Sequence, residues 1–361
     1  MLRRLLHNFL IIGNIIVVLG LVSCYFSVYV SPADFWLPAI IGLLYPFFLI
    51  ANLAYLIYWI FRWRWIFVMS LLAIVFGVNH LNSFFQFPFG KSKKVEKSDL
   101  SVMSYNVNLF RLYSWSKNKP THNEVMDFIK KNKFDVVCLQ EFYVNSSKFT
   151  EEDAKQKLGM YSYIKYILKR PQSAYGIAIF SKYPIVDSGE IIFENSFNSS
   201  IYTDIKVNND TIRVYNNHLQ SIRLKERNFN FLLKSEFRNE SNKYSELKDI
   251  LTRLHDAFDK RAFQVDKIAK HMSNCKYPII LCGDFNDSPV SYTYETLTRK
   301  LNDSFKEAGV GIVYTYAGLW PSYRIDYILH SNDFRAVSFY SPRVNYSDHY
   351  PVVTNYVLKR E

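Results

Sequence analysis

Asp284 and Asn286 are the residues of this chain whose types and spacing most directly suggest chemistry. They follow an apolar run, residues 277–282, that is typical of a buried strand. Side chains two residues apart lie on the same side of an extended backbone. A carboxylate and an amide placed in this way can together hold a phosphate oxygen and an attacking water. A Gly-Asp step followed by Asn is also common in turns, so the pair needs support from other residues.

Polar side chains also stand where other apolar runs stop. They are carboxylates, amides and histidines, and the set comprises Asn106, Glu141, His218, Asp326, Asp348 and His349. Strand ends gather at one edge of a layered sheet protein, and a cluster of these residue types there predicts a metal-assisted hydrolase. Taken singly, Glu141 could cap a loop and His218 could simply end a strand.

Asp326 needs a partner, because it lies within an apolar run and a buried carboxylate must be paired. Arg324 and His349 are the two candidates, and His349 is the more useful for chemistry. Asp348 and His349 together could also form a surface turn before Pro351.

Short strands are the main elements that must position these residues. Strands are predicted at 100–107, 135–140, 161–167, 174–181, 185–193, 200–207, 211–218, 278–283, 324–330, 335–340 and 350–357. Helical spacing of apolar residues predicts helices at 123–131, 243–273 and 291–300. Many strand pairs should be antiparallel, because few residues separate them, and the helices should cover the outer faces.

Six short motifs, read in order, resemble the endonuclease/exonuclease/phosphatase superfamily, which includes deoxyribonucleases and neutral sphingomyelinases. They are Ser104-Tyr105-Asn106-Val107, Leu139-Gln140-Glu141, Asn217-His218-Leu219, Gly283-Asp284-Phe285-Asn286, Arg324-Ile325-Asp326-Tyr327 and Ser347-Asp348-His349-Tyr350-Pro351. One such motif is weak, whereas six in order across about 100–358 are specific. The resemblance implies an α/β (α+β) fold, a four-layered sandwich of two mixed β-sheets flanked by helices.

The resemblance also implies a metal ion. By this pattern Glu141, helped by Asn106 and Asp348, holds Mg²⁺ or Mn²⁺, ions that prefer hard oxygen ligands. The ion stabilises negative charge that develops on the phosphoryl oxygens.

The remaining motif residues are implied to act on the substrate. His349, oriented by Asp326, lies near the phosphorus, and Asp284 orients or deprotonates the attacking water. Asn286 donates a hydrogen bond to a phosphate oxygen, and His218 stabilises the pentacovalent state or protonates the leaving oxygen. Either Asp284 or His349 could be the general base.

The expected activity is therefore hydrolysis of a phosphodiester bond. Asn108 stands where apurinic-site endonucleases carry a second acidic residue, which disfavours repair of abasic sites. A nucleic acid or a phospholipid or sphingolipid headgroup could be the substrate. A catalytically silent receptor for a phosphorylated ligand is a third interpretation, but binding alone would not require a base, its orienting carboxylate and a metal ligand together.

The first part of the chain is strongly apolar. Residues 9–30, 35–61 and 65–81 predict three transmembrane helices, since a span needs about 20 apolar residues. A buried soluble bundle and a cleaved signal peptide are the alternatives. Residues 21–24 resemble a lipoprotein cleavage site, although the residues after Cys24 stay apolar where a lipoprotein would have a polar tether.

Charges near these runs predict an orientation. Arg3 and Arg4 precede the first run and Arg62 and Arg64 precede the third, which places both groups in the cytoplasm. The expected protein is then a multi-pass inner-membrane protein whose catalytic domain is periplasmic. Four lysines between residues 91 and 97 oppose this orientation.

Three parts of the chain are thus predicted: a membrane anchor over 1–85, a linker over 86–99 and a catalytic domain over 100–361. A net charge of +12 suits partners that carry phosphate but does not choose among them. A segment at 221–243 mixes basic and apolar residues, and is either an arm for anionic lipid or substrate or a covering loop. Oligomeric state is not predicted.

Overall fold

The structure is a computed structural model of the chain. It describes residues 1–88, 98–111, 122–194, 196–224, 227–228, 231, 240–318 and 323–359. The predicted linker and the segment at 221–243 fall largely outside the described residues. Two compact units are present: unit 1 comprises Met1–Asn82, Gln220–Phe263 and Ser288–Glu295, and unit 2 comprises Ser83–Leu219, Gln264–Asp287 and Thr296–Glu361.

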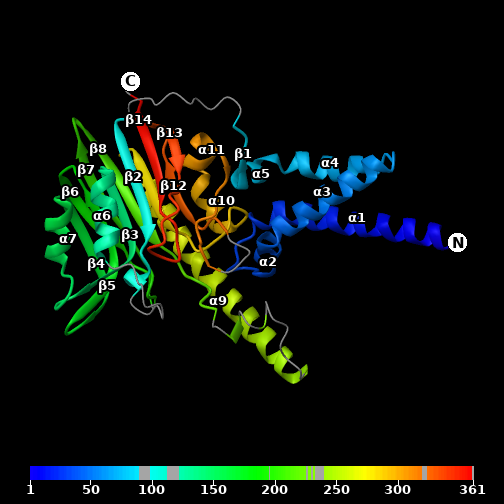
Figure 1. Ribbon diagram of the computed structural model, residues 1–361, viewed down its shortest axis with the longest axis horizontal. Coiled ribbons are helices and arrows are strands. Elements are labelled where there is room, and N and C mark those ends of the chain that lie inside the picture. The colour runs from blue at the N-terminus through cyan, green and yellow to red at the C-terminus, as the bar shows by residue number, and fades with distance from the viewer. Residues whose placement is uncertain are drawn as a thin grey trace. The chain divides into compact units, whose positions relative to one another are not determined.

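Unit 2 contains, within its described residues, two six-stranded sheets (Figure 1). Sheet I has the order β13 (Phe334–Tyr340), β14 (Val352–Leu358), β2 (Leu100–Asn106), β3 (Val136–Asn145), β5 (Ser173–Ser181), β4 (Tyr161–Arg170). Sheet II has the order β10 (Asn302–Asp303), β12 (Asp326–His330), β9 (Ile279–Asp284), β8 (Asp210–His218), β7 (Ser199–Val207), β6 (Ile185–Ile191). A further two-residue pair joins β1 (Phe85–Gln86) to β11 (Gly311–Ile312).

Both sheets are mixed. In sheet I, β2 pairs parallel with β3, and in sheet II, β8 pairs parallel with β9. The remaining neighbours in the two sheets pair antiparallel. Parallel strands end at the same edge of a sheet, so the residues that follow β2, β3, β8 and β9 are brought together in pairs.

The two sheets pack face to face around an apolar core. Alternate residues of their strands point into this layer, among them Val102, Ile179, Val214 and Ile328. Burying an aliphatic side chain of this kind contributes roughly 1.5–3 kcal/mol, so the core supplies much of the driving force for folding.

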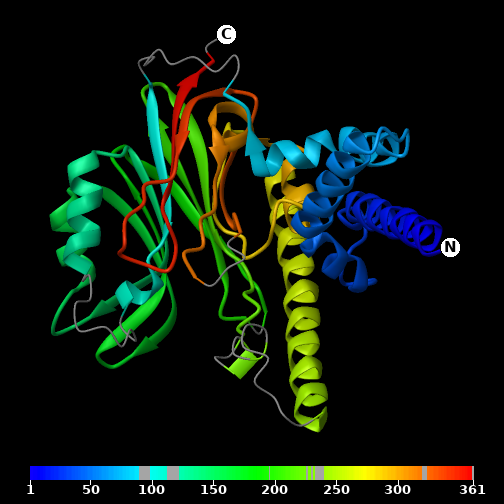
Figure 2. The ribbon, with the colours of Figure 1, turned by 45° about the vertical axis from the view of Figure 1, so that its right-hand side comes forward.

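Helices cover the outer faces of the two sheets (Figure 2). On sheet I, α6 (His122–Asn132) and α7 (Glu151–Leu158) bury an apolar face that includes Val125. On sheet II, the end of α9 (Glu240–Ser273) lies against the strands, where Nδ1 of His271 is 2.9 Å from the hydroxyl of Tyr215. The expected arrangement of two mixed sheets flanked by helices is thus found.

Several smaller elements were not predicted or differ in extent. Helix α7 was missed, although Thr150 and Asp153 form a capping box at its start. Strand β3 runs to Asn145, beyond the predicted end at residue 140. The other short elements are η1 (Asn108–Arg111), α10 (Tyr292–Thr298) and α11 (Ser304–Ala308).

Unit 1 contains the apolar helices. Helix α1 (Leu2–Ser27) is unbroken and is long and apolar enough to cross a membrane. The other two predicted spans are each broken: α2 (Leu37–Leu43) and α3 (Tyr45–Phe61) meet at 54°, and α4 (Phe67–Phe76) and α5 (Val78–Phe84) meet at 70°. Of the three predicted transmembrane helices, α1 is therefore found as one continuous helix of sufficient length within the described residues, and the other two are found only if each bent pair is counted as one span.

The breaks have local causes. Pro46 stands in the first turn of α3, where its missing N–H suits a helix start but cannot continue the preceding helix. Gly77 separates α4 from α5, and glycine lowers helix stability by about 1 kcal/mol relative to alanine.

Polar side chains inside unit 1 are paired between helices. Asn14 of α1 donates a hydrogen bond to Ser70 Oγ of α4 at 2.8 Å and accepts one from Trp59 Nε1 of α3 at 2.9 Å. Asn52 of α3 donates to the carbonyl of Val17 at 3.0 Å. In an apolar environment such pairs hold helices in a fixed register.

Candidate active site

The ends of the two parallel strand pairs carry three of the predicted residues. Asn106 ends β2 opposite Gln140 of β3, and His218 ends β8 opposite Asp284 of β9. Contacts of Asn106 and His218 with Asp284 show that these strand ends from the two sheets meet at one place. All eight residues predicted from sequence belong to unit 2.

Glu141 owes its direction to a β-bulge. Between Leu139 and Phe142, β3 has one more residue than the facing segment of β5, and Glu141 has a left-handed φ of 53°. A bulge of this kind redirects one side chain and locally increases the strand twist. Its carboxylate therefore leaves the alternating pattern of β3 and lies at the sheet edge.

Asn106 joins the two sheets at this edge. Its Nδ2 lies 3.0 Å from Asp284 Oδ2 and 3.4 Å from Glu141 Oε1, as hydrogen-bond donor to both. Its Oδ1 accepts a hydrogen bond from the backbone N–H of Asn108 at 3.0 Å. Asn108 thus acts through its backbone at this point.

His218 faces the same two carboxylates. Its Nε2 lies 3.7 Å from Glu141 Oε1 and 3.9 Å from Asp284 Oδ2. The side chain is mostly buried, at 10% exposure, while that of Glu141 is 26% exposed. Solvent or a ligand therefore reaches the site from the side of Glu141.

The turn after β9 fixes Asp284 and Asn286. Gly283 has a φ of +145°, and a Cβ there would lie 2.0 Å from the carbonyl oxygen of Asn217, so no larger residue fits. Asn286 has a φ of 53°; its backbone N–H donates to Asp284 Oδ1 at 2.9 Å, and its side-chain amide donates to the carbonyl of Leu219 at 3.0 Å. The amide has a second N–H for another acceptor.

Asp326 is hydrogen-bonded to His349, with 2.9 Å between Asp326 Oδ2 and His349 Nδ1. The other ring nitrogen, Nε2, lies 3.7 Å from Asp284 Oδ2. Arg324, the alternative partner, instead forms a buried ion pair with Asp303 at 2.7 Å. The imidazole is thus oriented by one carboxylate and presented to another.

The charges of this group are strongly coupled. Burial raises the pKa of Asp284 to about 6, and Asp326 adds to this effect while His349 and His218 oppose it. Burial lowers the pKa of His349, but Asp326 and Asp284 outweigh it and raise that pKa to about 10. His349 is therefore a cation at neutral pH.

Asp348 lies in the loop before β14. Its Oδ1 accepts from Ser347 Oγ at 3.2 Å, and its negative charge raises the pKa of His349. Ser347 Oγ is also 2.8 Å from the carbonyl oxygen of Asn106, which ties this loop to the end of β2.

Sequence reasoning missed residues that support the site. Thr315 Oγ1 accepts hydrogen bonds from the backbone of Ile325 and Asp326, each at 3.0 Å. The ring of Tyr316 packs edge-on against His349 with centroids 5.4 Å apart. The pair precedes a segment rich in Gly, Trp and Pro, which gives no sign of a role at the site. Only the contacts of these two residues with Asp326 and His349 reveal that role.

A buried amide network links the two sheets behind the site. Gln140 Nε2 donates to Asn216 Oδ1 at 2.6 Å and to Ser104 Oγ at 3.1 Å. Asn216 Nδ2 donates in turn to the carbonyls of Leu139 and Ala178. Because Gln140 directly precedes Glu141, this network holds the end of sheet I against sheet II.

The donor groups present fit a divalent metal ion. Asp284 and Asp326 offer carboxylate oxygens that lie within 4.8 Å of each other and of a ring nitrogen of His349, which as a cation is not itself a ligand. Asp326 Oδ1 is buried without a hydrogen-bond partner in the described part of the chain, and burial, with a smaller contribution from Asp326, raises the pKa of Asp284. A cation would relieve both. Asn106, predicted as a ligand, contacts Asp284 directly. Glu141, also predicted as a ligand, is linked to Asp284 through Asn106 and His218.

The chain belongs to the Endonuclease/Exonuclease/phosphatase family. The model of that family matches residues 103–349, which contain all eight predicted site residues. A second family model, described as a domain of unknown function, matches residues 7–84. A search of the curated proteins finds no match to this chain.

Solved structures share the fold at low identity. An endonuclease/exonuclease/phosphatase from Beutenbergia cavernae is 18% identical, with a TM-score of 0.51, over 73% of this chain and 72% of that one. The human Nocturnin catalytic domain with bound sulfate anion is 17% identical, with a TM-score of 0.50, over 73% and 97%. A humanized D. rerio TDP2 is 14% identical, with a TM-score of 0.50, over 71% and 98%.

Proposed function

We propose that this protein is a membrane-anchored phosphodiesterase that requires a divalent metal ion. The observation that carries the proposal is the convergence of Glu141, Asp284 and the Asp326–His349 pair at one edge of the two sheets. Family membership supports hydrolysis of a phosphoester, and the geometry supplies the groups that such a reaction needs.

The site residues fall into two groups: those that would hold a metal ion and orient the water, and those that would act on the phosphate. Glu141, Asn106 and Asp348, with Asp284 beside them, would hold Mg²⁺ or Mn²⁺, and the bound ion would supply positive charge to the phosphoryl oxygens. Asp284 orients the attacking water.

The remaining residues act on the phosphate itself. His349, held by Asp326 through Nδ1, presents Nε2 to a phosphoryl oxygen. His218 lies near the same oxygen of Asp284, with its Nε2 3.9 Å from Oδ2, and would serve the leaving oxygen. The second N–H of Asn286 is the donor for a phosphate oxygen.

A nucleic acid is the substrate that we favour, since the net charge is +12 and the chain belongs to a family named for nucleases and phosphatases. A lipid headgroup phosphodiester is the second candidate, because α1 would hold the enzyme beside a bilayer.

The anchor is α1, with the two bent helix pairs as broken spans. Figure 1 shows the N-terminus of α1 and the turn between α3 and α4 at the same end of these helices. Arg3, Arg4, Arg62 and Arg64 therefore lie at one end, which would face the cytoplasm and leave the catalytic domain outside it.

One experiment tests activity and substrate together. The purified full-length protein is incubated with plasmid DNA and, separately, with mixed phospholipid and sphingomyelin vesicles, each with Mg²⁺ or with EDTA. We expect Mg²⁺-dependent cleavage of DNA. Release of phosphorylated headgroups in place of DNA cleavage would select the lipid substrate, and no hydrolysis of either would contradict the proposal.

A further inference from the structure

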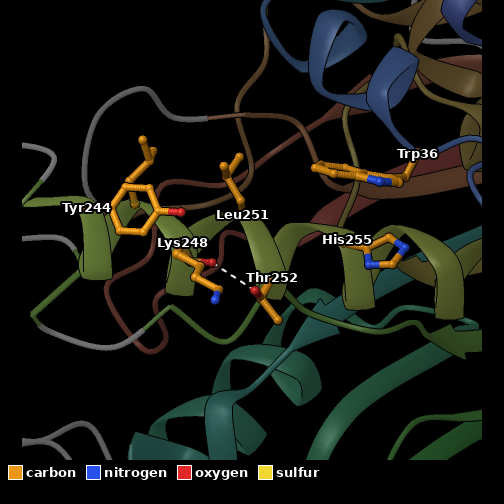
Figure 3. A pocket seen from close by; sticks show the side chains of 7 residues that line it. Trp36, Tyr244, Lys248, Leu251, Thr252 and His255 are labelled. Carbon is orange, nitrogen blue, oxygen red and sulfur yellow. Dashed lines mark hydrogen bonds between the residues drawn. The ribbon is translucent and has the colours of Figure 1, made fainter.

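A groove on α9 has no role in the proposed chemistry. Its volume is about 280 Å³, and it is lined by Trp36, Tyr244, Leu247, Lys248, Leu251, Thr252 and His255 (Figure 3). All of these residues belong to unit 1. The groove is thus built only from the first half of α9 and the residue that precedes α2.

The exposed wall of the groove is an apolar stripe. Tyr244, Leu247 and Leu251 are spaced three and four residues apart and so lie on one face of α9. Tyr244 is 73% exposed and Leu247 is 47% exposed. An exposed stripe of large apolar side chains is typical of a surface that contacts a lipid or another protein.

A neighbouring face of α9 packs inside unit 1. Ile250 and Ala257, seven residues apart, are buried on that face, whereas Tyr244 and Leu247 on the groove side are exposed. Internal packing therefore does not account for Leu247.

The other wall connects the groove to the membrane anchor. Trp36 immediately precedes α2, and its ring packs against that of His255 of α9 at a tilt of 42°, with ring centroids 5.1 Å apart. It ends the loop that follows α1, and this loop also exposes the side chains of Tyr29 and Phe35, at 59% and 51%. If α1 crosses a bilayer, its connecting loop lies at the bilayer surface.

Aromatic residues at a helix end are characteristic of the membrane–water interface. The turn between α3 and α4, at the other end of these helices, exposes Trp63 and Trp65 at 93% and 85%. The two turns thus carry aromatic groups at opposite ends of the apolar helices. The contact between Trp36 and His255 then fixes the first half of α9 at the level of one interface.

We propose that the apolar stripe of α9 and Trp36 form a lipid-binding surface that lies in the outer part of the bilayer and admits acyl-chain segments of phospholipids into the groove. The proposal rests on the membrane anchoring proposed above. Lys248 fits this placement, because its apolar stem can lie along lipid while its ammonium group reaches a headgroup phosphate.

The test uses site-directed fluorescence in the full-length protein. Cys275 is first replaced by serine, because Cys24, Cys138 and Cys282 are buried. Leu247→Cys in this background is labelled with bimane and reconstituted into phosphatidylcholine vesicles. Fluorescence loss is measured with phospholipid that carries a doxyl quencher in its acyl chain, and with iodide in the water.

Lys260→Cys is the matched control, since Lys260 is an exposed residue of α9 that does not line the groove. We expect the label at position 247 to lose most of its fluorescence with the doxyl lipid and little with iodide. The label at position 260 should show the reverse.

Strong quenching of the label at 247 by iodide would overturn the proposal, as this face would then be in water. Quenching by neither agent would also overturn it, because a protein surface, from this chain or a second copy, would then cover the stripe. In either case the protein would remain in the vesicles after an alkaline wash, and the anchor would stand. Release by the wash would reject the anchor and the lipid surface together.

Discussion

The imidazole of His349 is held in place by the carboxylate of Asp326 and lies beside the carboxylate of Asp284. Asp326 fixes Nδ1 at 2.9 Å, and together with Asp284 it outweighs burial and raises the pKa of the ring. Without the negative charge of Asp326, the pKa of His349 would fall. The ring would then lose both its orientation and part of its positive charge.

We therefore expect Asp326→Asn to reduce turnover of a phosphodiester by a factor of roughly 10²–10⁴, the range usual for a positioned acid–base group. The measurement is kcat for bis(4-nitrophenyl) phosphate with saturating Mg²⁺. Asp210→Asn, at the exposed first residue of β8, should retain full activity. A kcat for Asp326→Asn equal to that of the wild type would mean that the pair does not serve catalysis.

At the level of residues, the sequence indicated the candidate site residues but not the direction of each side chain. Polar residues after apolar runs predicted Asn106, His218 and Asp284 as strand ends, because strand termination is a local property. The bulge that turns Glu141 depends on pairing with β5, and the partner of Arg324 is Asp303, 21 residues earlier. Such contacts between distant residues leave no local pattern.

At the scale of elements, β9 and β8 must approach closely for their ends to share a site. Gly283 permits this approach, since a Cβ there would meet the Asn217 carbonyl oxygen at 2.0 Å and the backbone φ is +145°. Gly159 also has a positive φ, of +63°, but nothing lies within 4 Å of its added Cβ.

Gly283→Ala should therefore lower the free energy of unfolding by more than about 3 kcal/mol, because strain and a backbone clash add. Gly159→Ala should cost only about 1 kcal/mol, since it carries the backbone strain alone. Urea unfolding of the two variants measures the difference. Equal stability of the two would show that β8 and β9 are not as close as described.

The amide network couples the two sheets behind the site. Gln140→Leu removes the donor to Asn216 and to Ser104, and leaving such buried groups unsatisfied costs about 1–3 kcal/mol. Turnover should also fall at temperatures where the variant is folded, because Glu141 follows directly. Asn355→Leu, which removes a 2.8 Å amide hydrogen bond to Ser338, is the control and should leave turnover unchanged.

Helices and strands were predicted well where one face is clearly apolar. They were predicted less well where packing against other elements determines whether and how far an element extends. Apart from β3 and the two-residue β10, the strands of both sheets and the helix at 243–273 have limits within three residues of those expected. Helix α7 was missed because it is short and buries little more than Ala154, so its apolar periodicity is weak. The predicted second and third spans were read from composition, which does not register the break before Pro46 or at Gly77.

On the scale of the whole molecule, an apolar N-terminal helix and an endonuclease/exonuclease/phosphatase domain are encoded in one chain. We expect the full-length protein to stay in the membrane fraction after an alkaline carbonate wash, since α1 alone has the length and hydropathy of a span. A chain that begins at residue 98 should lose this property. Recovery of the full-length protein in the wash would refute anchoring.

The charges at one end of these helices predict the orientation of the protein in the membrane. An alkaline phosphatase fused after Glu361 folds only outside the cytoplasm, so it should be active in cells. A β-galactosidase fusion at the same position should be inactive. The opposite pattern would place the catalytic domain in the cytoplasm.

A requirement for a divalent metal ion is the property on which the proposed chemistry depends. Full-length protein and its Glu141→Gln variant are stripped with EDTA, and hydrolysis of bis(4-nitrophenyl) phosphate is followed as Mg²⁺ is added back. We predict no turnover without the ion, saturable recovery in the wild type, and little recovery in the variant. Equal turnover in EDTA and in Mg²⁺ would contradict the account.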